Sequence, residues 1–179
     1  MAAARSLTDN EIRAARLFFG SHLDYAAVRI RCGFPLLPDL SAAVSPDGRI
    51  YFPRRHYLPD YTQAGSGYLL WLIHELTHVW QWQHGFHTWL GGLILSAQGG
   101  YSRRRAYRCP PPERIATFAS LNMEQQAETA ACCFALLAGT ARYSPQEESG
   151  YRRLAAEFAA QSDAFRPLPR YFCRIGKIK

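Results

Sequence analysis

A short run of residues between positions 74 and 78 has the residue types and the spacing of a metal-dependent hydrolase. The sequence there is His74-Glu75-Leu76-Thr77-His78, the pattern His-Glu-x-x-His. On a helix, two histidines four residues apart lie about one turn apart on the same face, so both imidazoles can bind one metal ion. Glu75 is rotated by about 100° from His74, which leaves its carboxylate beside the metal. There it could hold and deprotonate a water molecule, as in zinc hydrolases.

The segment around this motif, from Gly67 to Phe86, is apolar on nearly every side. Its apolar side chains are those of Leu69, Leu70, Trp71, Leu72, Ile73, Leu76, Val79 and Trp80. A helix that is hydrophobic all round is an interior helix. Two histidines and a glutamate are costly to bury in such a helix without partners. The pattern therefore favours a bound zinc ion over core histidines that bond only to backbone carbonyls.

A catalytic zinc site needs three protein ligands and one open position, and the chain has three candidates for the third ligand. Glu124 lies on the next long helical segment and resembles the gluzincin arrangement, in which a glutamate on a second helix completes the site. Glu128 stands four residues later on the same face, where it would orient a ligand histidine or bind the metal itself. His84 stands ten residues after His74, as in the metzincin pattern. Gln81, however, replaces the glycine at which a metzincin chain leaves the helix.

A hydrogen-bond donor on the far side of the metal would stabilise the oxyanion that develops during attack on a carbonyl group. The eligible donors are Tyr101, Tyr107, Tyr143, His87 and the arginines between positions 103 and 108. Tyr107 is favoured because it lies in the loop that leads into the Glu124 segment. We therefore predict Glu75 and Tyr107 as the catalytic residues.

The composition is that of one globular domain over residues 1–179, with residues 1–6 and 170–179 as loose tails. The chain is 48% apolar and 20% charged, and it is long enough to bury a sizeable core. The N-terminus has no apolar signal region, and the longest apolar runs are far shorter than the roughly 20 residues that cross a bilayer. We therefore expect synthesis in the cytoplasm without a signal peptide, and no membrane span.

The formal net charge is +7, which raises the question of a nucleic-acid partner. The basic residues gather in two small groups, Arg54-Arg55-His56 and Arg103-Arg104-Arg105, with Arg108 nearby. No helix-turn-helix, zinc-finger or RNA-binding signature accompanies them. We expect a solvated basic surface and no specific nucleic acid.

The five cysteines are odd in number and lack Cys-x-x-Cys spacing. Reduced thiols fit a protein made in the cytoplasm. One disulfide after export, for example between Cys32 and Cys109, stays open because connectivity does not follow from sequence.

The periodicity predicts an α+β fold with a small N-terminal sheet. Thr8 and Glu11 form a capping box for a helix that ends at Gly20. Residues 24–31 alternate between apolar and polar side chains, which is typical of a half-exposed strand. Pro46-Asp47-Gly48 lies between two short β-prone runs, residues 42–44 and 49–52, and predicts a hairpin.

Further long helices are predicted after the metal helix. Residues 87–100 would form a short helix or a wall of the active-site cleft, and the Arg- and Pro-rich residues 101–112 a loop. A second long helix would begin at Glu113 or Ser120 and end at Ala138 before a glycine. A third would open at Ser144-Pro145 and run to about Phe165.

Taken together, these segments resemble a known family. They are similar to the short Vgr-related proteins of Gram-negative bacteria and to the metalloprotease domain at the C-terminus of some VgrG spike proteins of type VI secretion. The resemblance covers the chain from about Leu7 to Leu137. The matching pieces are Leu7-Thr8 with Glu11, Phe19-Gly20, the run from Asp24 to Ile30, the Pro46-Asp47-Gly48 turn, the run from Ile73 to Gln81, and Glu124-Gln125-Gln126-Ala127.

This resemblance implies a zincin-like domain and a zinc metallopeptidase. Zn²⁺ would be held by His74, His78 and Glu124, with Glu75 as the catalytic base and a peptide or protein as substrate. The family's activity is linked to antibacterial toxicity, which implies an effector exported by type VI secretion into a target cell. Its partners would be a VgrG spike or a cognate immunity protein. The alternative function is a non-catalytic adaptor or partner-binding module that zinc only braces.

Overall fold

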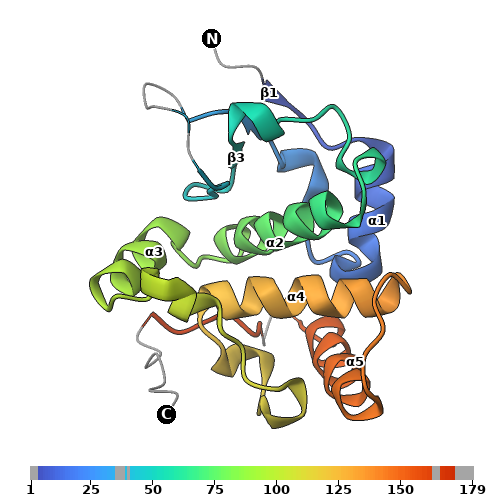
Figure 1. Ribbon diagram of the computed structural model, residues 1–179. Coiled ribbons are helices and arrows are strands. Elements are labelled where there is room, and N and C mark those ends of the chain that lie inside the picture. The colour runs from blue at the N-terminus through green and yellow to red at the C-terminus, as the bar shows by residue number, and fades with distance from the viewer. Residues whose placement is uncertain (1–3, 35–38, 40, 163–165, 172–179) are drawn as a thin grey trace.

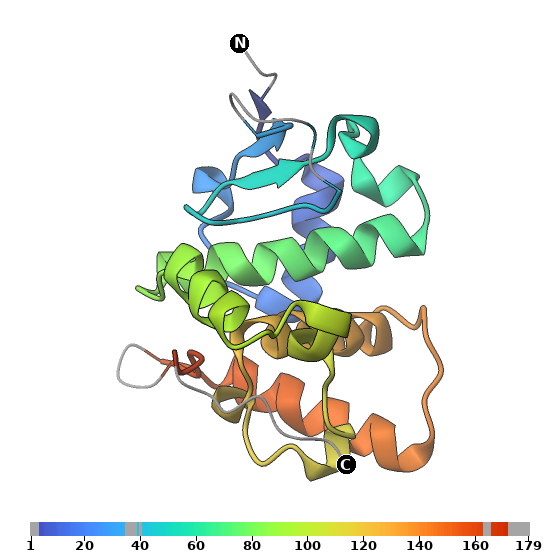
Figure 2. The same cartoon turned by 60° about the vertical axis from the view of Figure 1, so that its left-hand side comes forward.

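Helix α2 (Ser66–Gln83), which carries the His-Glu-x-x-His motif, lies between the sheet and the other long helices (Figure 1). The computed structural model describes residues 4–34, 39, 41–162 and 166–171. The sheet lies on one side of α2, helix α4 (Met123–Leu137) lies on the other, and α5 (Pro145–Ala159) lies beyond α4 (Figures 1 and 2). The fold is therefore α+β, mostly helical with a small sheet, as the periodicity predicts.

The sheet has three short strands, β1 (Ala4–Arg5), β2 (Ile30–Cys32) and β3 (Ile50–Phe52), in the order β1-β2-β3. β1 pairs antiparallel with β2, and β2 pairs parallel with β3. The predicted hairpin at Pro46-Asp47-Gly48 is reduced to one isolated antiparallel bridge between Val44 and Tyr51. The parallel register places Ile30 opposite Ile50, and both side chains are fully buried. The pairing of β2 with β3 therefore contributes side chains to the hydrophobic core.

The strand predicted from Asp24 begins only at Ile30. The Asp24 carboxylate accepts hydrogen bonds from the backbone amides of Ala26 and Ala27 and caps a 3-10 helix, Tyr25–Ala27. A side chain that bonds to the backbone just after it competes with strand pairing. The residues before Ile30 therefore do not join the sheet, although their apolar and polar side chains alternate.

Of the residues 1–6 predicted as a loose tail, Ala4 and Arg5 form β1, and residues 1–3 lie outside the described part. Arg5 forms a salt bridge to Glu11 with a 2.7 Å separation between Nη2 and Oε1. Glu11 is fully buried, and it also accepts hydrogen bonds from the backbone amides of Thr8 and Tyr61. The predicted capping box at Thr8 is confirmed, and its glutamate additionally joins β1 to α1 (Asp9–Phe19).

Within the described ranges, the remaining elements are helix α3 and several short 3-10 segments. α3 spans Thr88–Ala97, which confirms the short helix proposed there. α5 starts at Pro145 as predicted but ends at Ala159 rather than near Phe165. The chain leaves the helix there, and Gln161 turns inward to accept a hydrogen bond from the Trp80 indole. Residues 163–165 lie outside the described part. The other 3-10 helices are Arg54–His56, Tyr61–Gln63, Ser102–Tyr107, Pro112–Arg114 and Phe118–Ser120.

Aromatic side chains fasten the helices together. The ring of Phe158 on α5 stacks on Phe18 of α1 at 4.4 Å between centroids and lies 4.8 Å from Trp80 of α2. On the opposite side of α2, Phe52 of β3 meets Trp71 edge-on at 5.0 Å. This packing fixes α2 on both sides, so the side chains of its middle turns have a defined environment. Among the described residues, no helix combines the length and the apolar character needed to cross a bilayer.

Candidate metal centre

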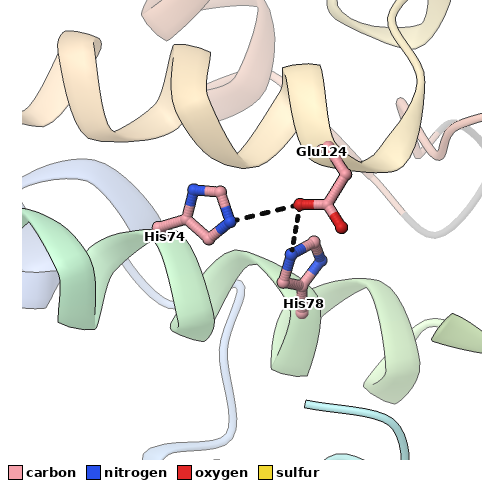
Figure 3. Close-up of side chains that lie close together, drawn as sticks. All are labelled: His74, His78 and Glu124. Atoms are coloured by element: carbon pink, nitrogen blue, oxygen red, sulfur yellow. Dashed lines mark ion pairs between the residues drawn. The ribbon is translucent and has the colours of Figure 1, made fainter. Parts of the chain in front are cut away.

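Three predicted ligands converge between α2 and α4. Glu124 Oε2 lies 3.3 Å from His74 Nε2 and 3.3 Å from His78 Nε2 (Figure 3). One ligating atom from each of the three residues lies within 4.8 Å of the others. The two histidines extend from α2 toward the start of α4, and the carboxylate points back toward them (Figure 3). Two imidazole nitrogens and one carboxylate oxygen are donors of the kinds that also occur in catalytic zinc sites.

The N-terminal cap of α4 positions Glu124. Asn122 accepts a hydrogen bond from the backbone amide of Gln125, and the Gln125 side chain accepts one from the amide of Asn122. Glu124 thus occupies the first turn of α4, where the helix dipole stabilises a negative charge. Asn122 also donates from Nδ2 to the carbonyl oxygen of Ala106 at 3.1 Å. The same cap therefore holds both Glu124 and the segment that carries Tyr107.

The charges of Glu124, His74 and His78 are strongly coupled to one another. Glu124 Oε2 is buried and accepts no hydrogen bond. Burial opposes ionisation of Glu124, but the imidazoles of His78 and His74 outweigh it and lower the pKa of the carboxyl group far below its usual range. Burial likewise opposes protonation of His78, yet Glu124 raises its pKa to about 9. Without a metal, a proton on His78 balances the buried carboxylate.

The other two candidates for the third ligand lie outside this group. Glu128 Oε1 stands 3.6 Å from His74 Nδ1, on the side of the ring away from Glu124, where the sequence predicts that it orients the imidazole. It also faces Arg104 Nη2 at 3.9 Å. His84 is the C-cap of α2, with its Nδ1 2.8 Å from the carbonyl oxygen of Trp80. Because α2 continues through Gln83, His84 points away from the site.

Glu75, the predicted base, is buried and is fixed by a contact that sequence reasoning missed. Ser45 Oγ donates a hydrogen bond to Glu75 Oε2 at 2.8 Å. The backbone carbonyl of Ser45 in turn accepts a hydrogen bond from Thr88 Oγ1 at 2.7 Å. Ser45 follows the Val44 bridge directly, so the edge of the sheet sets the position of the Glu75 carboxylate. Sequence spacing alone carries no signal for a contact over 30 residues.

Two tyrosines of the segment between α3 and α4 line the site. Tyr107, the predicted oxyanion donor, stacks on the His74 ring with centroids 6.1 Å apart. Tyr101 donates its hydroxyl to Glu124 Oε1 at 2.9 Å, a contact for which sequence reasoning gave it no preference. Burial, reinforced by the charge of Glu124, raises the pKa of both hydroxyls, so both remain hydrogen-bond donors at neutral pH.

The candidate ligands, Glu75 and the two tyrosines line one cavity of about 470 Å³. Its polar end contains the three candidate ligands, Glu75 and both tyrosines. Its other walls are mainly apolar and come from residues 42–46, α3 and the start of α4. They are formed by Ala42, Ala43, Val44, Ser45, Pro46, Thr88, Trp89, Gly92 and Met123. The side chain of Trp89 is 53% exposed at this cavity, which is unusual for so large an apolar group and leaves it available to a ligand.

None of the cysteines in the described ranges belongs to the group of candidate ligands. Cys32 and Cys109 are free, so the disulfide left open between them is not formed. Burial raises the pKa of Cys109 to about 12, and its Sγ lies near Thr129 Oγ1 rather than near the three ligands. A thiol with so high a pKa is a poor nucleophile at neutral pH.

Comparisons with known proteins place the fold in a family. No family model matches the chain. The solved effector domain of Pseudomonas aeruginosa VgrG2b has the same fold, with a TM-score of 0.67 and 30% sequence identity. The match covers 87% of this chain and 84% of that domain. The chain belongs to the VgrG2b effector-domain family.

The sequence comparison also shows how much of the VgrG2b spike protein this chain matches. The chain is 33% identical over 129 residues to the type VI secretion system spike protein VgrG2b of P. aeruginosa. These residues are 70% of the chain but only 12% of the spike protein. The resemblance to an effector domain of VgrG spike proteins is thereby confirmed, and it concerns the VgrG2b effector domain rather than the spike as a whole.

Proposed function

We propose that this chain is a zinc-dependent peptidase of zincin-like architecture. The observation that carries the proposal is the buried Glu124 Oε2, which accepts no hydrogen bond and lies between His74 Nε2 and His78 Nε2. A buried carboxylate oxygen is rarely left without a hydrogen bond, and a cation among these three atoms would bind all of them. Imidazole nitrogens and a carboxylate oxygen suit zinc better than the harder cations, which prefer oxygen ligands.

A zinc ion at this site would polarise the carbonyl group of a peptide bond and make a water molecule more acidic. The residues of the chain then perform the proton transfers. Ser45 holds Glu75 Oε2, so we assign Oε1 as the atom that takes the proton from the attacking water. Glu75 would pass this proton to the leaving amide nitrogen. Tyr107, protonated and beside His74, would donate to the developing oxyanion.

The walls of the cavity favour a peptide with an apolar side chain close to the scissile bond. Ala43, Val44, Met123 and the exposed Trp89 line the cavity together with the polar groups. Burying an apolar side chain among such groups contributes about 25 cal/mol per Å² of apolar area, which would favour apolar over charged peptides.

The test of the peptidase is zinc content and peptide cleavage in the wild type and in Glu75→Gln. We expect one zinc per chain in both, and a loss of cleavage in the variant only, because Glu75 is not a ligand. Glu148→Gln is the matched control, since Glu148 lies on α5 outside the cavity lining, where its half-buried side chain pairs with Arg152. A wild-type chain with one zinc that cleaves no peptide of a broad panel, apolar and charged members included, would contradict the proposal.

We further propose that the chain is an antibacterial effector of type VI secretion. Membership of the VgrG2b effector-domain family supports this role. The natural partners would be a VgrG spike, which carries the domain into a target cell, and a cognate immunity protein in the producer. The test is a competition between bacteria that deliver the wild type or Glu75→Gln. Equal killing by both would show that toxicity does not depend on the proposed peptidase reaction.

A second candidate function is a non-catalytic module that zinc braces. The observation that favours it is the position of the three ligands on two helices, since an ion there would join α2 to α4. Melting temperatures with and without chelator decide between the two candidates. A large loss of stability on chelation, together with no cleavage and no effect of Glu75→Gln, would support the module.

A further inference from the structure

Buried hydrogen bonds lead from His78 away from the metal centre through two glutamine side chains. His78 Nδ1 lies 2.9 Å from Gln81 Oε1, and Gln81 Nε2 donates to Gln126 Oε1 at 3.0 Å. Gln126 Nε2 donates to the backbone carbonyl oxygens of Phe118, at 2.9 Å, and Pro167, at 2.8 Å. Both glutamines are fully buried. We name Gln81 and Gln126 the glutamine relay.

The backbone carbonyls fix the direction of every hydrogen bond in the relay. A carbonyl oxygen only accepts, so the amide nitrogen of Gln126 must face Phe118 and Pro167, and its oxygen must face Gln81. Gln81 therefore turns its amide nitrogen toward Gln126 and toward the carbonyl oxygen of Met123 at 3.2 Å. Its oxygen then faces His78. A flip of either amide would bring buried oxygen atoms together and leave buried groups without partners.

This direction assigns the hydrogen on the imidazole of His78. Because Gln81 Oε1 only accepts, the hydrogen of the ring must lie on Nδ1. The neutral ring then carries its lone pair on Nε2, the nitrogen that faces Glu124. In the other tautomer, Nε2 would carry a hydrogen and could not bind a cation, and Nδ1 would oppose the oxygen of Gln81.

We propose that the glutamine relay holds His78 in the tautomer with its lone pair on Nε2, and thereby raises the affinity of the His74–His78–Glu124 site for zinc. Gln126 acts here as a positioning residue without touching His78, since Gln81 lies between them. The inference rests on the proposed zinc site. It adds that buried hydrogen bonds fix the imidazole of His78 more firmly than that of His74. The Nδ1 atom of His74 faces Glu128, whose side chain is 35% exposed and is therefore held less firmly.

The test measures zinc affinity in Gln126→Met and Gln81→Met by competition with a chromogenic chelator at neutral pH. Methionine has nearly the same length and cannot replace the hydrogen bonds. We expect both variants to bind zinc about 10- to 100-fold more weakly, the usual effect of losing a residue that orients a ligand. Gln161→Met is the matched control. Gln161 is also buried and bonds to Trp80 and Phe158, outside the relay, so its variant should keep wild-type affinity.

Nitrogen NMR of the metal-free chain, at a pH where the imidazole is neutral, gives a readout that needs no zinc. We expect the hydrogen of His78 on Nδ1 in the wild type and a mixture of tautomers in Gln126→Met. If Gln126→Met does not fold, the spectra of Gln81→Met and the wild type still show which nitrogen of His78 carries the hydrogen. Two results would contradict the proposed role of the glutamine relay and leave the proposed function standing. One is a hydrogen on Nε2 of His78 in the wild type, and the other is a folded Gln126→Met with wild-type zinc affinity. A wild type that binds no zinc overturns the affinity claim together with the proposed function.

Discussion

Ser45 donates its hydroxyl to Glu75 Oε2 at 2.8 Å, and both side chains are buried. A residue from the edge of the sheet thus fixes the carboxylate that the proposed reaction needs as its base. We expect Ser45→Ala to lower kcat/KM by roughly 10- to 100-fold, because a hydrogen bond to a charged group contributes about 1.5–3 kcal/mol. Ser45→Thr, which keeps a hydroxyl, should recover most of the loss.

Zinc affinity provides the control for this prediction. Ser45 contacts Glu75 and not the candidate ligands, so Ser45→Ala should bind zinc as the wild type does. A Ser45→Ala variant that cleaves peptides at the wild-type rate would show that the hydrogen bond has no part in positioning the base.

Tyr101 and Tyr107 should have separate effects. Tyr101 bonds to Glu124 Oε1, so Tyr101→Phe removes a hydrogen bond that holds a ligand and should weaken zinc binding by about tenfold. Tyr107 stacks on His74 without bonding to a ligand, so Tyr107→Phe should leave zinc affinity unchanged and lower kcat by about 10²-fold or more if it is the oxyanion donor. A loss of kcat in Tyr101→Phe alone, with zinc affinity intact, would transfer the oxyanion role to Tyr101.

The stability of the metal-free chain should depend on pH through His78. Its pKa is about 9 in the folded chain because of Glu124, above the ordinary value of 6.5. A raised pKa contributes stability that is fully present below pH 6.5 and is lost as the pH rises toward 9. The loss should amount to no more than about 3.5 kcal/mol.

Urea unfolding of chelator-treated protein at several pH values between 6.5 and 9 measures this effect. His78→Gln should show a weaker dependence, since it has no proton to lose there. Saturation with zinc should also weaken the dependence, because a bound ion replaces the proton beside Glu124. An equal dependence in wild type and His78→Gln would assign the effect to another group.

Phe158 joins α1, α2 and α5 through ring contacts with Phe18 and Trp80, and it is fully buried. We expect Phe158→Ala to lower the free energy of unfolding by about 3–5 kcal/mol, since it leaves a cavity between three helices. Leu137→Ala is the control, because Leu137 is 41% exposed at the end of α4 and should cost less than about 1 kcal/mol. Urea denaturation measures both, and a similar loss in the two variants would contradict this account of the core.

The sequence predicts the elements that local patterns determine. The all-apolar run around His74 predicts an interior helix, and Thr8 and Ser144-Pro145 mark where α1 and α5 begin. These starts and this helix depend on residues close together in the chain, so local spacing predicts them. Glu124 is a candidate ligand for another reason, its resemblance to the gluzincin arrangement, in which a glutamate on a second helix completes the site.

What the sequence does not predict depends on contacts between distant residues. The parallel pairing of Ile30 with Ile50 and the two-residue strand β1 arise from tertiary packing, which overrides the hairpin signal of the Pro46-Asp47-Gly48 turn. The contact of Ser45 with Glu75 is of the same kind. Gln81 is different, since it stands three residues after His78 on the same helix. Its burial beside a ligand could have been inferred from helical spacing.

The short strand β1 limits how far the N-terminus can be trimmed. Arg5 supplies the cation for Glu11, which is fully buried and also holds the amide of Tyr61. A version of the chain that starts after Arg5 would leave this carboxylate without its counter-ion, at a cost of about 3–5 kcal/mol. Expression of shortened forms should therefore retain Ala4 and Arg5, although both lie more than 60 residues before the metal helix motif.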